Sequence, residues 1–252
     1  SDKSVTVSTA SPGNGQTFTV NATVTDKAGN QSTQGSDSAV IDTRAPDAPG
    51  ASLATDSGSS NSDAVSKVGT INVNGIESGA TWQFSVDAGK TWSSAQSDST
   101  TTFTLTEGSY ASGDVRIKQT DAAGNTSSVK QMGVVTVDQT SPAAPGLSLQ
   151  ADSGSNTSDG ITNNGQINIS GLESNGSWEF STDSGNSWTS GSGSSFTLAD
   201  ATYAEGQVRV RQTDLAGNTG GVATLEAITV DTTAPTTPTV AASSTNDSTP
   251  TI

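Results

Sequence analysis

The hexapeptide Thr-Asp-Lys-Ala-Gly-Asn at residues 25–30 returns twice further along the chain. It stands as Thr-Asp-Ala-Ala-Gly-Asn at 120–125 and as Thr-Asp-Leu-Ala-Gly-Asn at 213–218, so its aspartates lie 95 and 93 residues apart. A second pattern, an aliphatic residue followed by Asp-x-x-x-Pro, begins at residues 41, 137 and 230, with spacings of 96 and 93. Two independent markers share one period, which is the signature of a repeat protein.

The repeats divide the chain into modules. Residues 47–142 and 143–235 align along their whole length, so that Trp82-Gln83-Phe84-Ser85 matches Trp178-Glu179-Phe180-Ser181. Residues 1–46 carry only the second half of the pattern, and residues 236–252 carry only an opening. The sequence therefore predicts the C-terminal part of one module (1–46), two complete modules (47–142 and 143–235) and the start of a further one (236–252).

Within a module, apolar residues alternate with polar ones over short runs such as 71–73, 82–84, 103–105 and 115–117. This period of two predicts half-buried strands, and glycine-containing turns separate the runs. About seven short strands in roughly 95 residues are typical of an immunoglobulin-like sandwich. We therefore expect an all-β chain of tandem immunoglobulin-like β-sandwiches in an elongated array. Tyr110 and Tyr203 precede the sixth strand, where each is either a tyrosine corner or a plain core residue.

The composition excludes several classes of function. Acidic residues number 25 against 10 basic ones, giving a net charge of −15, so nucleic acid and anionic lipid are not expected as partners. Histidine and cysteine are absent, which removes the usual general base, zinc ligands and disulfides. No apolar run approaches the ~20 residues of a membrane span, so we expect no membrane insertion. The acids recur in turns of each repeat, as scaffold features do, and we expect no enzymatic activity.

Sandwich topology predicts where the aspartates gather. Alternate loops of a seven-strand sandwich fall at opposite ends, and the loop after the first strand shares an end with the close of the last strand. Asp56 and Asp63 lie in that loop, and Asp138 closes the last strand. Asp214 and Asn218 lie between strands F and G of the next module, at its opposite end. These five side chains are therefore expected to converge on one junction.

Carboxylates crowded together repel one another unless a cation binds them. Two like charges at ~4 Å repel by about 1 kcal/mol in bulk water and about 4 kcal/mol at an effective dielectric of 20. A hard divalent cation with oxygen ligands offsets this repulsion, and ligands from separate flexible loops suit Ca²⁺ better than Mg²⁺. The same reasoning assigns ligands at the first junction to Asp42, Asp121 and Asn125, and at the last junction to Asp152, Asp159 and Asp231. The sequence thus predicts Ca²⁺ clamps between neighbouring modules.

The segments at 85–92 and 181–188 resemble the Asp-box hairpin of sialidases and other propellers. In such a hairpin the aspartate accepts turn amide protons, and we expect Trp92 and Trp188 to fold back onto the core. An array of carbohydrate-binding modules is the alternative function, with these candidate stacking residues: Trp82, Trp92, Trp178 and Trp188. A sialidase-like hydrolase is disfavoured, because the chain has only four arginines and most of them lie in repeat strands.

The paired markers carry a wider resemblance. Modules that end in Val-Asp-x-Thr-x-Pro and contain Thr-Asp-x-Ala-Gly-Asn resemble the bacterial Ig-like (BIg) repeats of giant adhesins, and the resemblance covers nearly the whole chain. It implies type I secretion, an extracellular position on the bacterial cell surface, calcium at module junctions, and contact with a host-cell glycan or receptor or with biofilm matrix. The expected function is a calcium-stiffened stalk or adhesive segment of a large surface adhesin that serves cell adhesion and virulence.

Overall fold

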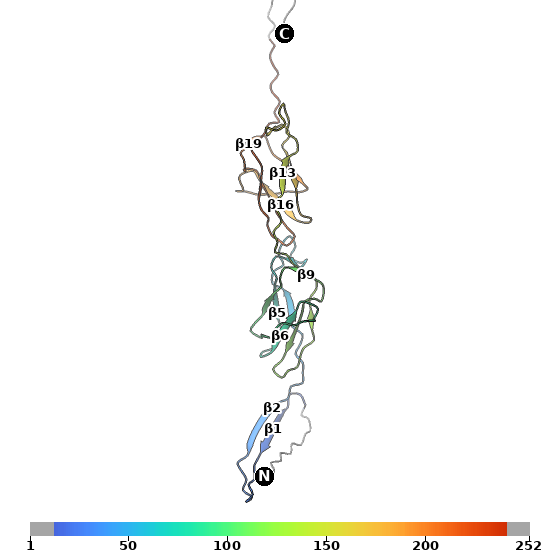
Figure 1. The fold of residues 1–252 in the computed structure, drawn as a ribbon, viewed down its shortest axis with the longest axis vertical. Helices are drawn as coiled ribbons and strands as arrows, with labels where there is room; N and C mark the ends of the chain where they lie inside the picture. Colours follow the sequence, from blue (N-terminus) through green and yellow to red (C-terminus); the bar gives the residue numbers. More distant parts are fainter. Residues whose placement is uncertain (1–12, 241–252) are drawn as a thin grey trace, which may run out of the picture. The chain divides into compact units, whose positions relative to one another are not determined.

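The computed structural model describes residues 13–240 and contains no helix among them (Figure 1). The predicted all-β sandwich fold is confirmed. Contacts divide the chain into two compact units. Unit 1 holds the described residues up to Thr140 together with the loop Leu215–Asn218, and unit 2 holds Ser141–Asp214 and the described residues from Thr219 onward. The predicted module boundaries stay a prediction, and residues 1–12 and 241–252 of the two partial modules lie outside the described residues.

Unit 1 begins with an antiparallel hairpin and continues as a sandwich. The hairpin pairs β1 (Thr17–Ala22) with β2 (Gly35–Val40). One sheet has the order β3 (Gly50–Leu53), β5 (Thr70–Asn74), β8 (Thr102–Thr104). The facing sheet has the order β11 (Lys130–Gln131), β10 (Arg116–Thr120), β6 (Thr81–Ser85), β7 (Gln96–Ser97). A third, smaller sheet has the order β4 (Val65–Ser66), β12 (Val135–Val137), β9 (Gly108–Tyr110).

Unit 2 repeats the same three sheets. The first has the order β13 (Gly146–Leu149), β15 (Gln166–Ser170), β18 (Ser195–Thr197). The second has the order β17 (Thr189–Ser190), β16 (Ser177–Ser181), β20 (Arg209–Thr213), β21 (Ala223–Thr224). The third has the order β14 (Ile161–Thr162), β22 (Ile228–Val230), β19 (Ala201–Tyr203). In both units the short first strand of the third sheet runs parallel to its neighbour.

Each sandwich encloses one apolar core. In unit 1 the inward residues of the strands meet around Trp82, which is 1% exposed and lies 6.0 Å from the ring of Phe103. Trp178 occupies the same place in unit 2, 6.0 Å from Phe196. Burying one tryptophan removes roughly 150–250 Å² from water, which stabilises a module by at most about 4–6 kcal/mol. A module with so few aromatics therefore depends heavily on this one ring.

The tyrosines before the sixth strand form tyrosine corners. The Tyr110 hydroxyl donates to the carbonyl of Thr106 at 3.0 Å, and the Tyr203 hydroxyl donates to the carbonyl of Ala199 at 3.1 Å. Each bond reaches four residues back along the chain, as this corner requires. Tyr203 also belongs to the core of unit 2, so in that module both expectations hold.

The placement of the second tryptophan of each module corrects the sequence-based expectation. Trp92 and Trp188 are only half-buried and belong to neither core cluster. The Nζ of Lys118 lies 4.2 Å from the Trp92 ring centroid, and the Arg211 guanidinium lies 4.1 Å from that of Trp188. Lys118 lies on the face of β10 opposite the buried Ile117, so this ring covers the outside of the sheet. The aromatic rings of the core come instead from Trp82, Phe84 and Phe103.

Candidate functional site

The Thr-Asp-x-Ala-Gly-Asn repeat folds as a closed loop around its aspartate. Oδ1 of Asp121 accepts the amide protons of Ala123 (2.9 Å) and Asn125 (2.8 Å), and Oδ2 accepts Nδ2–H of Asn125 (2.9 Å). Gly124 has a φ of +96°, a conformation in which a side chain would be strained. The hydrogen bonds to Asp121 lower the pKa of its carboxyl below the ordinary value, and the bond from the Asn125 side chain contributes most. This carboxylate is thus already occupied by donors of its own loop.

The asparagine of this loop also reaches a predicted partner. Nδ2 of Asn125 donates to the main-chain carbonyl of Asp42 at 3.1 Å. Also within unit 1, Nδ2 of Asn218 donates to the carbonyl of Asp138 at 2.8 Å. The structure therefore brings Asn125 to Asp42 and Asn218 to Asp138, as predicted. In both pairs the asparagine binds the main-chain carbonyl of the aspartate and not its carboxylate.

The carboxylates at the ends of the last strands cap the turns that follow them. Oδ1 of Asp42 accepts the Arg44 amide proton at 3.0 Å, and Oδ1 of Asp138 accepts that of Thr140 at 3.0 Å. In unit 2, Oδ1 of Asp231 accepts the amide proton of Thr233 at 2.9 Å. These are local turns of the type that aspartate favours.

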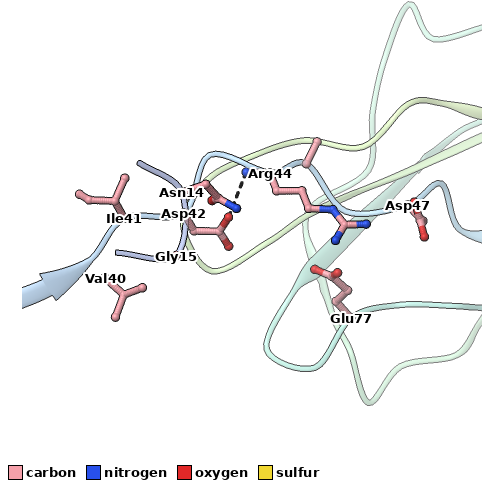
Figure 2. A pocket seen from close by; sticks show the side chains of 9 residues that line it. Asn14, Gly15, Val40, Ile41, Asp42, Arg44, Asp47 and Glu77 are labelled. Carbon is pink, nitrogen blue, oxygen red and sulfur yellow. Dashed lines mark hydrogen bonds between the residues drawn. The ribbon is translucent and has the colours of Figure 1, made fainter. Parts of the chain in front are cut away.

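A hollow of about 330 Å³ lies beside the first of these turns, within unit 1. Figure 2 shows Asp42 on one side of it and the Arg44 side chain extending toward Asp47 and Glu77. One cation thus lies among three acids, which lowers their mutual repulsion. The hollow adjoins Val40, which is 66% exposed at the end of the β1–β2 hairpin.

The loop after the first strand of each sandwich contains an aspartate that has one buried oxygen without a hydrogen-bond partner. Oδ2 of Asp56 accepts the amide proton of Ala64 at 3.0 Å, whereas its Oδ1 is buried and has no hydrogen-bond partner. Asp152 repeats this arrangement in unit 2, with Oδ2 bound to the amide of Gly160 at 3.0 Å and Oδ1 buried without a donor. A buried, unsatisfied charged oxygen is costly, and its recurrence in two modules calls for an explanation such as an ion.

The predicted calcium ligands differ in how well their carboxylate oxygens could bind an ion. Among residues 13–240, no three acidic side chains lie close enough together to hold a metal. Oδ1 of Asp63 and of Asp159 each accepts an amide proton two residues on, both at 3.1 Å. Asp214 is 6% exposed in unit 2. The atoms that fit a cation best are therefore the Oδ1 oxygens of Asp56 and Asp152, and the full ligand sets stay predictions.

A buried glutamine, which lies outside the repeated motifs, holds the start of each sandwich. Gln119 is 0% exposed, and its Nε2 donates to the carbonyls of Asp47 (2.7 Å) and Gly75 (3.0 Å). Its Oε1 accepts the amide proton of Glu77 at 2.9 Å. Asp47 belongs to the segment that leads into β3, so this side chain fixes the entering chain to the sandwich. We call it the glutamine pin.

The glutamine pin recurs entirely within unit 2. Gln212 is 2% exposed and binds the carbonyls of Ala143 (2.7 Å) and Gly171 (3.0 Å) and the amide of Glu173 (2.9 Å). A signal for it was present in the sequence. Ile117 and Gln119 are alternate residues of β10, so period two places the glutamine on the same buried face as the isoleucine.

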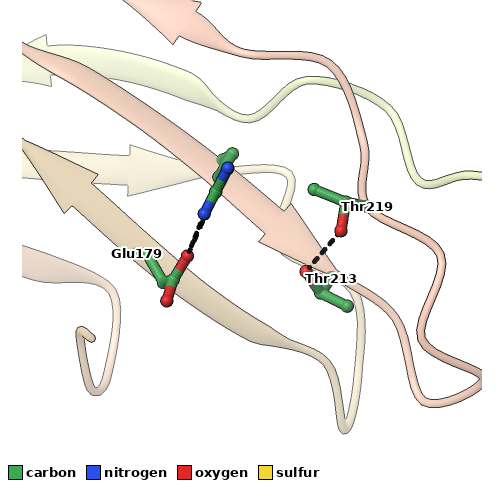
Figure 3. A network of polar contacts seen from close by, with 4 residues as sticks. Glu179, Thr213 and Thr219 are labelled. Atoms are coloured by element: carbon green, nitrogen blue, oxygen red, sulfur yellow. Dashed lines mark hydrogen bonds and ion pairs between the residues drawn. The ribbon is translucent and has the colours of Figure 1, made fainter. Parts of the chain in front are cut away.

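The outer face of the second sheet differs in charge between the two units. Arg211 donates to Oε2 of Glu179 through Nη2 (2.8 Å) and Nε (3.0 Å), with both side chains about one-third exposed. Figure 3 shows Glu179 with its ion pair and, on the neighbouring strand, Thr213, whose hydroxyl lies 3.1 Å from that of Thr219. In unit 1 the facing pair is Lys118 and Gln83. In both units a cation lies over one face of the outer tryptophan, so that face is not open to a sugar.

Comparison with known proteins adds no family assignment. No protein-family model and no curated relative matches the chain. Among solved structures, the fibronectin(III)-like modules of Clostridium thermocellum CbhA are similar, with 17% identity, a TM-score of 0.37, and coverage of 68% of this chain and 92% of that one. Domains 7, 8 and 9 of the S-layer protein SbsC are similar at 12% identity and a TM-score of 0.24, covering 84% and 69%. No helix in residues 13–240 is long and apolar enough to cross a membrane.

Proposed function

We propose that this chain is a non-enzymatic, extracellular segment of a large bacterial surface adhesin, in which it serves as a stiff stalk that also carries adhesive contacts. Its partners are a host-cell glycan or receptor or biofilm matrix, together with the neighbouring modules of the same chain. The repeated markers and their resemblance to BIg modules motivate the adhesin assignment. The glutamine pin carries the stalk assignment.

The glutamine pin supports stiffness for a physical reason. A chain that joins two sandwiches bends most easily where it enters the next domain, because its backbone there has no ladder partner. Gln119 and Gln212 remove that freedom by binding the entering backbone from inside the core. Pro46 and Pro49 are buried in the same entering segment of unit 1 and fix its φ angles. A solvated binding loop would not need a buried amide committed to three backbone groups.

Calcium is the second part of the proposal. The donor-free oxygens of Asp56 and Asp152 would each supply one ligand to the ion. Bound Ca²⁺ would offset the negative charge of the loop and tie the segments on either side of it together. Asp63 and Asp159 lie in the same loops and are the nearest further acids along the chain.

A melting experiment on the full chain tests the calcium proposal. Millimolar Ca²⁺ is expected to raise the Tm relative to chelator, because a ligand that binds only the folded state stabilises it. The change Asp56→Asn should reduce this calcium-dependent shift, whereas Asp37→Asn on the exposed strand β2 should preserve it. An equal Tm with Ca²⁺ and with chelator would refute calcium binding while leaving the glutamine pin intact. Small-angle scattering under the same two conditions then tests whether the ion also stiffens the chain.

A further inference from the structure

The three Thr-Asp-x-Ala-Gly-Asn loops of the chain differ in how far their alanine is exposed. The loop Leu215–Asn218 belongs to unit 1, and Ala216 at its centre is 0% exposed. The matching residues of the other two loops, Ala28 and Ala123, are both exposed. The motif therefore folds without a covering surface, and the burial of Ala216 comes from the surface of unit 1 on which its loop lies.

Unit 1 holds this loop with a small docking surface, which consists of Ser57, Gly58 and the main-chain carbonyl of Asp138. The Ser57 hydroxyl donates to the Ala216 carbonyl at 2.6 Å. Nδ2 of Asn218 donates to the Asp138 carbonyl at 2.8 Å. A methyl group on Gly58 would overlap the Leu215 carbonyl, so only glycine lets the two backbones approach this closely. The surface thus recognises the backbone and the asparagine of the motif.

Unit 2 has the same docking surface at the matching positions of its repeat, which are Ser153, Gly154 and Asp231. In both units the serine hydroxyl accepts the amide proton of the residue ten positions on, at 2.9 Å in unit 1 and 2.7 Å in unit 2. The glycine has a φ of +102° in unit 1 and +110° in unit 2. A methyl group at Gly154 would meet no atom of the described residues within 4 Å. The surface of unit 2 is therefore preformed and, at Gly154, open within the described part of the chain.

The exposed loop at residues 25–30 has the geometry that this surface needs. Oδ1 of Asp26 accepts the amide protons of Ala28 and Asn30, both at 2.9 Å. The glycine of this loop has a φ of +90°, and that of the docked loop has +91°. Asn125 shows that one side-chain amide can close its own loop and bind an aspartate carbonyl at the same time. Because the loop is already ordered, it loses little conformational freedom on docking, which favours binding.

The charges of this loop and this surface are also complementary. In unit 1 the cation belongs to the surface, where Nζ of Lys67 donates to the Gly217 carbonyl at 2.7 Å, and the docked loop has leucine at its third position. Unit 2 has Asn163 in place of that lysine, and residues 152–163 contain two acids and no basic residue. The exposed loop has Lys27 at its third position. Its cation would therefore approach a negatively charged surface, which favours this pairing.

We propose that the docking surface of unit 2 binds residues 25–30 of a second copy of this chain. The Ser153 hydroxyl donates to the Ala28 carbonyl of that copy, and its asparagine side chain donates to the Asp231 carbonyl. Because the loop and the surface are different parts of the molecule, this contact joins copies head to tail. The contact is small, so we expect weak association with a Kd of about 1 mM. The inference goes beyond the proposed function, which concerns neighbouring modules of one chain.

Nuclear magnetic resonance on the isotope-labelled full chain, with chelator present, tests the proposal. Between about 0.05 mM and about 2 mM, the amide signals of Asn163 and of residues 27–30 should shift along one saturable curve. Ala28→Trp should weaken this association by at least about tenfold, because its counterpart Ala216 has no exposed surface when docked. Ala123→Trp is the matched control, since it changes the exposed alanine of another loop with the same motif and should leave the association unchanged.

A mixture of two variants provides an independent test. Gly154→Ala places a methyl group on the docking surface. Its control for backbone strain is Gly206→Ala, at a glycine with a φ of +71° and no described atom within 4 Å of an added methyl group. Gly154→Ala and Ala28→Trp should each fail to self-associate. Their mixture combines an intact loop from one variant with an intact surface from the other, so it should form pairs with the wild-type Kd.

Several results would overturn the inference, and circular dichroism melts verify that each variant is folded. They are the absence of concentration-dependent shifts up to about 2 mM, an equal loss in either control variant, and no association in the mixture. Association that appears only with Ca²⁺ would also overturn it, because an ion and not these hydrogen bonds would then join the copies. The calcium-dependent Tm shift is measured separately, so failure here is distinguishable from failure of the proposed function.

Discussion

Replacing Gln119 by leucine gives the sharpest test of the glutamine pin. Leucine has a similar volume and fits a buried position, but it cannot bind the carbonyls of Asp47 and Gly75 or the amide of Glu77. The side chain makes three hydrogen bonds of 2.7–3.0 Å with no exposure to solvent. A typical intramolecular hydrogen bond contributes about 0.5–1.5 kcal/mol net, so three contribute roughly 1.5–4.5 kcal/mol. Asp47 and Gly75 are exposed residues that water can reach, and we therefore expect a loss of about 2–3 kcal/mol.

Chemical denaturation measures this loss in the module that contains Gln119. With an m-value of about 1–3 kcal/mol/M in urea, the midpoint of its transition should fall by roughly 0.7–3 M. Native-state hydrogen exchange gives the local readout, because the Glu77 amide loses its acceptor and should exchange faster than other amides of unit 1. Gln139→Leu, at an exposed glutamine of the same unit, is the matched control. A loss below about 0.5 kcal/mol, the usual range for surface substitutions, together with unchanged Glu77 exchange would refute the reasoning.

Two further predictions concern the Asp-box hairpins and the tryptophans. Hydrogen bonds from Thr91 and Ser187, foremost among several, lower the pKa of Asp87 and Asp183 from 3.8 to about 2. The ionised carboxylates of Asp87 and Asp183 therefore contribute their full stabilisation of the folded state above about pH 4 and lose it as the pH falls toward 2. A double Asp87→Asn, Asp183→Asn variant lacks these carboxylates, so its Tm should decrease less over that pH range than the Tm of the wild type. Trp82→Ala should cost about 3–5 kcal/mol because it empties the core. Trp92→Ala should cost no more than about 2 kcal/mol, since it removes a half-buried ring and one cation–π contact. Equal urea midpoints for these two variants would contradict their assignment to the core and the outer face.

The strands were predictable because their pattern is local. Ile71, Trp82 and Ile117 lie on period-two runs, and the structure buries each of them. The outward position of Trp92 was not predictable in this way. It follows a turn, where period two is lost, and its side is decided by whether the core still has space. That depends on how Trp82 packs against Phe84 of its own strand and against Phe103 of β8.

For the candidate sites, too, the sequence predicted which residues meet but not which of their atoms form the hydrogen bonds. Asn125 and Asp42 were predicted to meet from strand order alone, and they do meet. That Asn125 uses the carbonyl of Asp42, and that Asp121 turns inward onto its own loop, depends on side-chain rotamers and on the positions of individual atoms. The donor-free oxygen of Asp56 likewise follows from which oxygen the Ala64 amide reaches. Sequence spacing carries no information at that scale.

The glutamine pin and the calcium proposal concern opposite ends of the same strand. Asp47 precedes β3 and Asp56 follows it, so the pin fixes the chain where it enters the module and an ion would act where the chain leaves β3. They share no hydrogen-bond partner, and effects at such separate sites normally add within ≈ 0.3–0.5 kcal/mol. The loss caused by Gln119→Leu should therefore be the same with Ca²⁺ and with chelator. A stalk built this way would retain the stiffness of each entering segment when calcium is scarce, and it would lose only what the ion contributes.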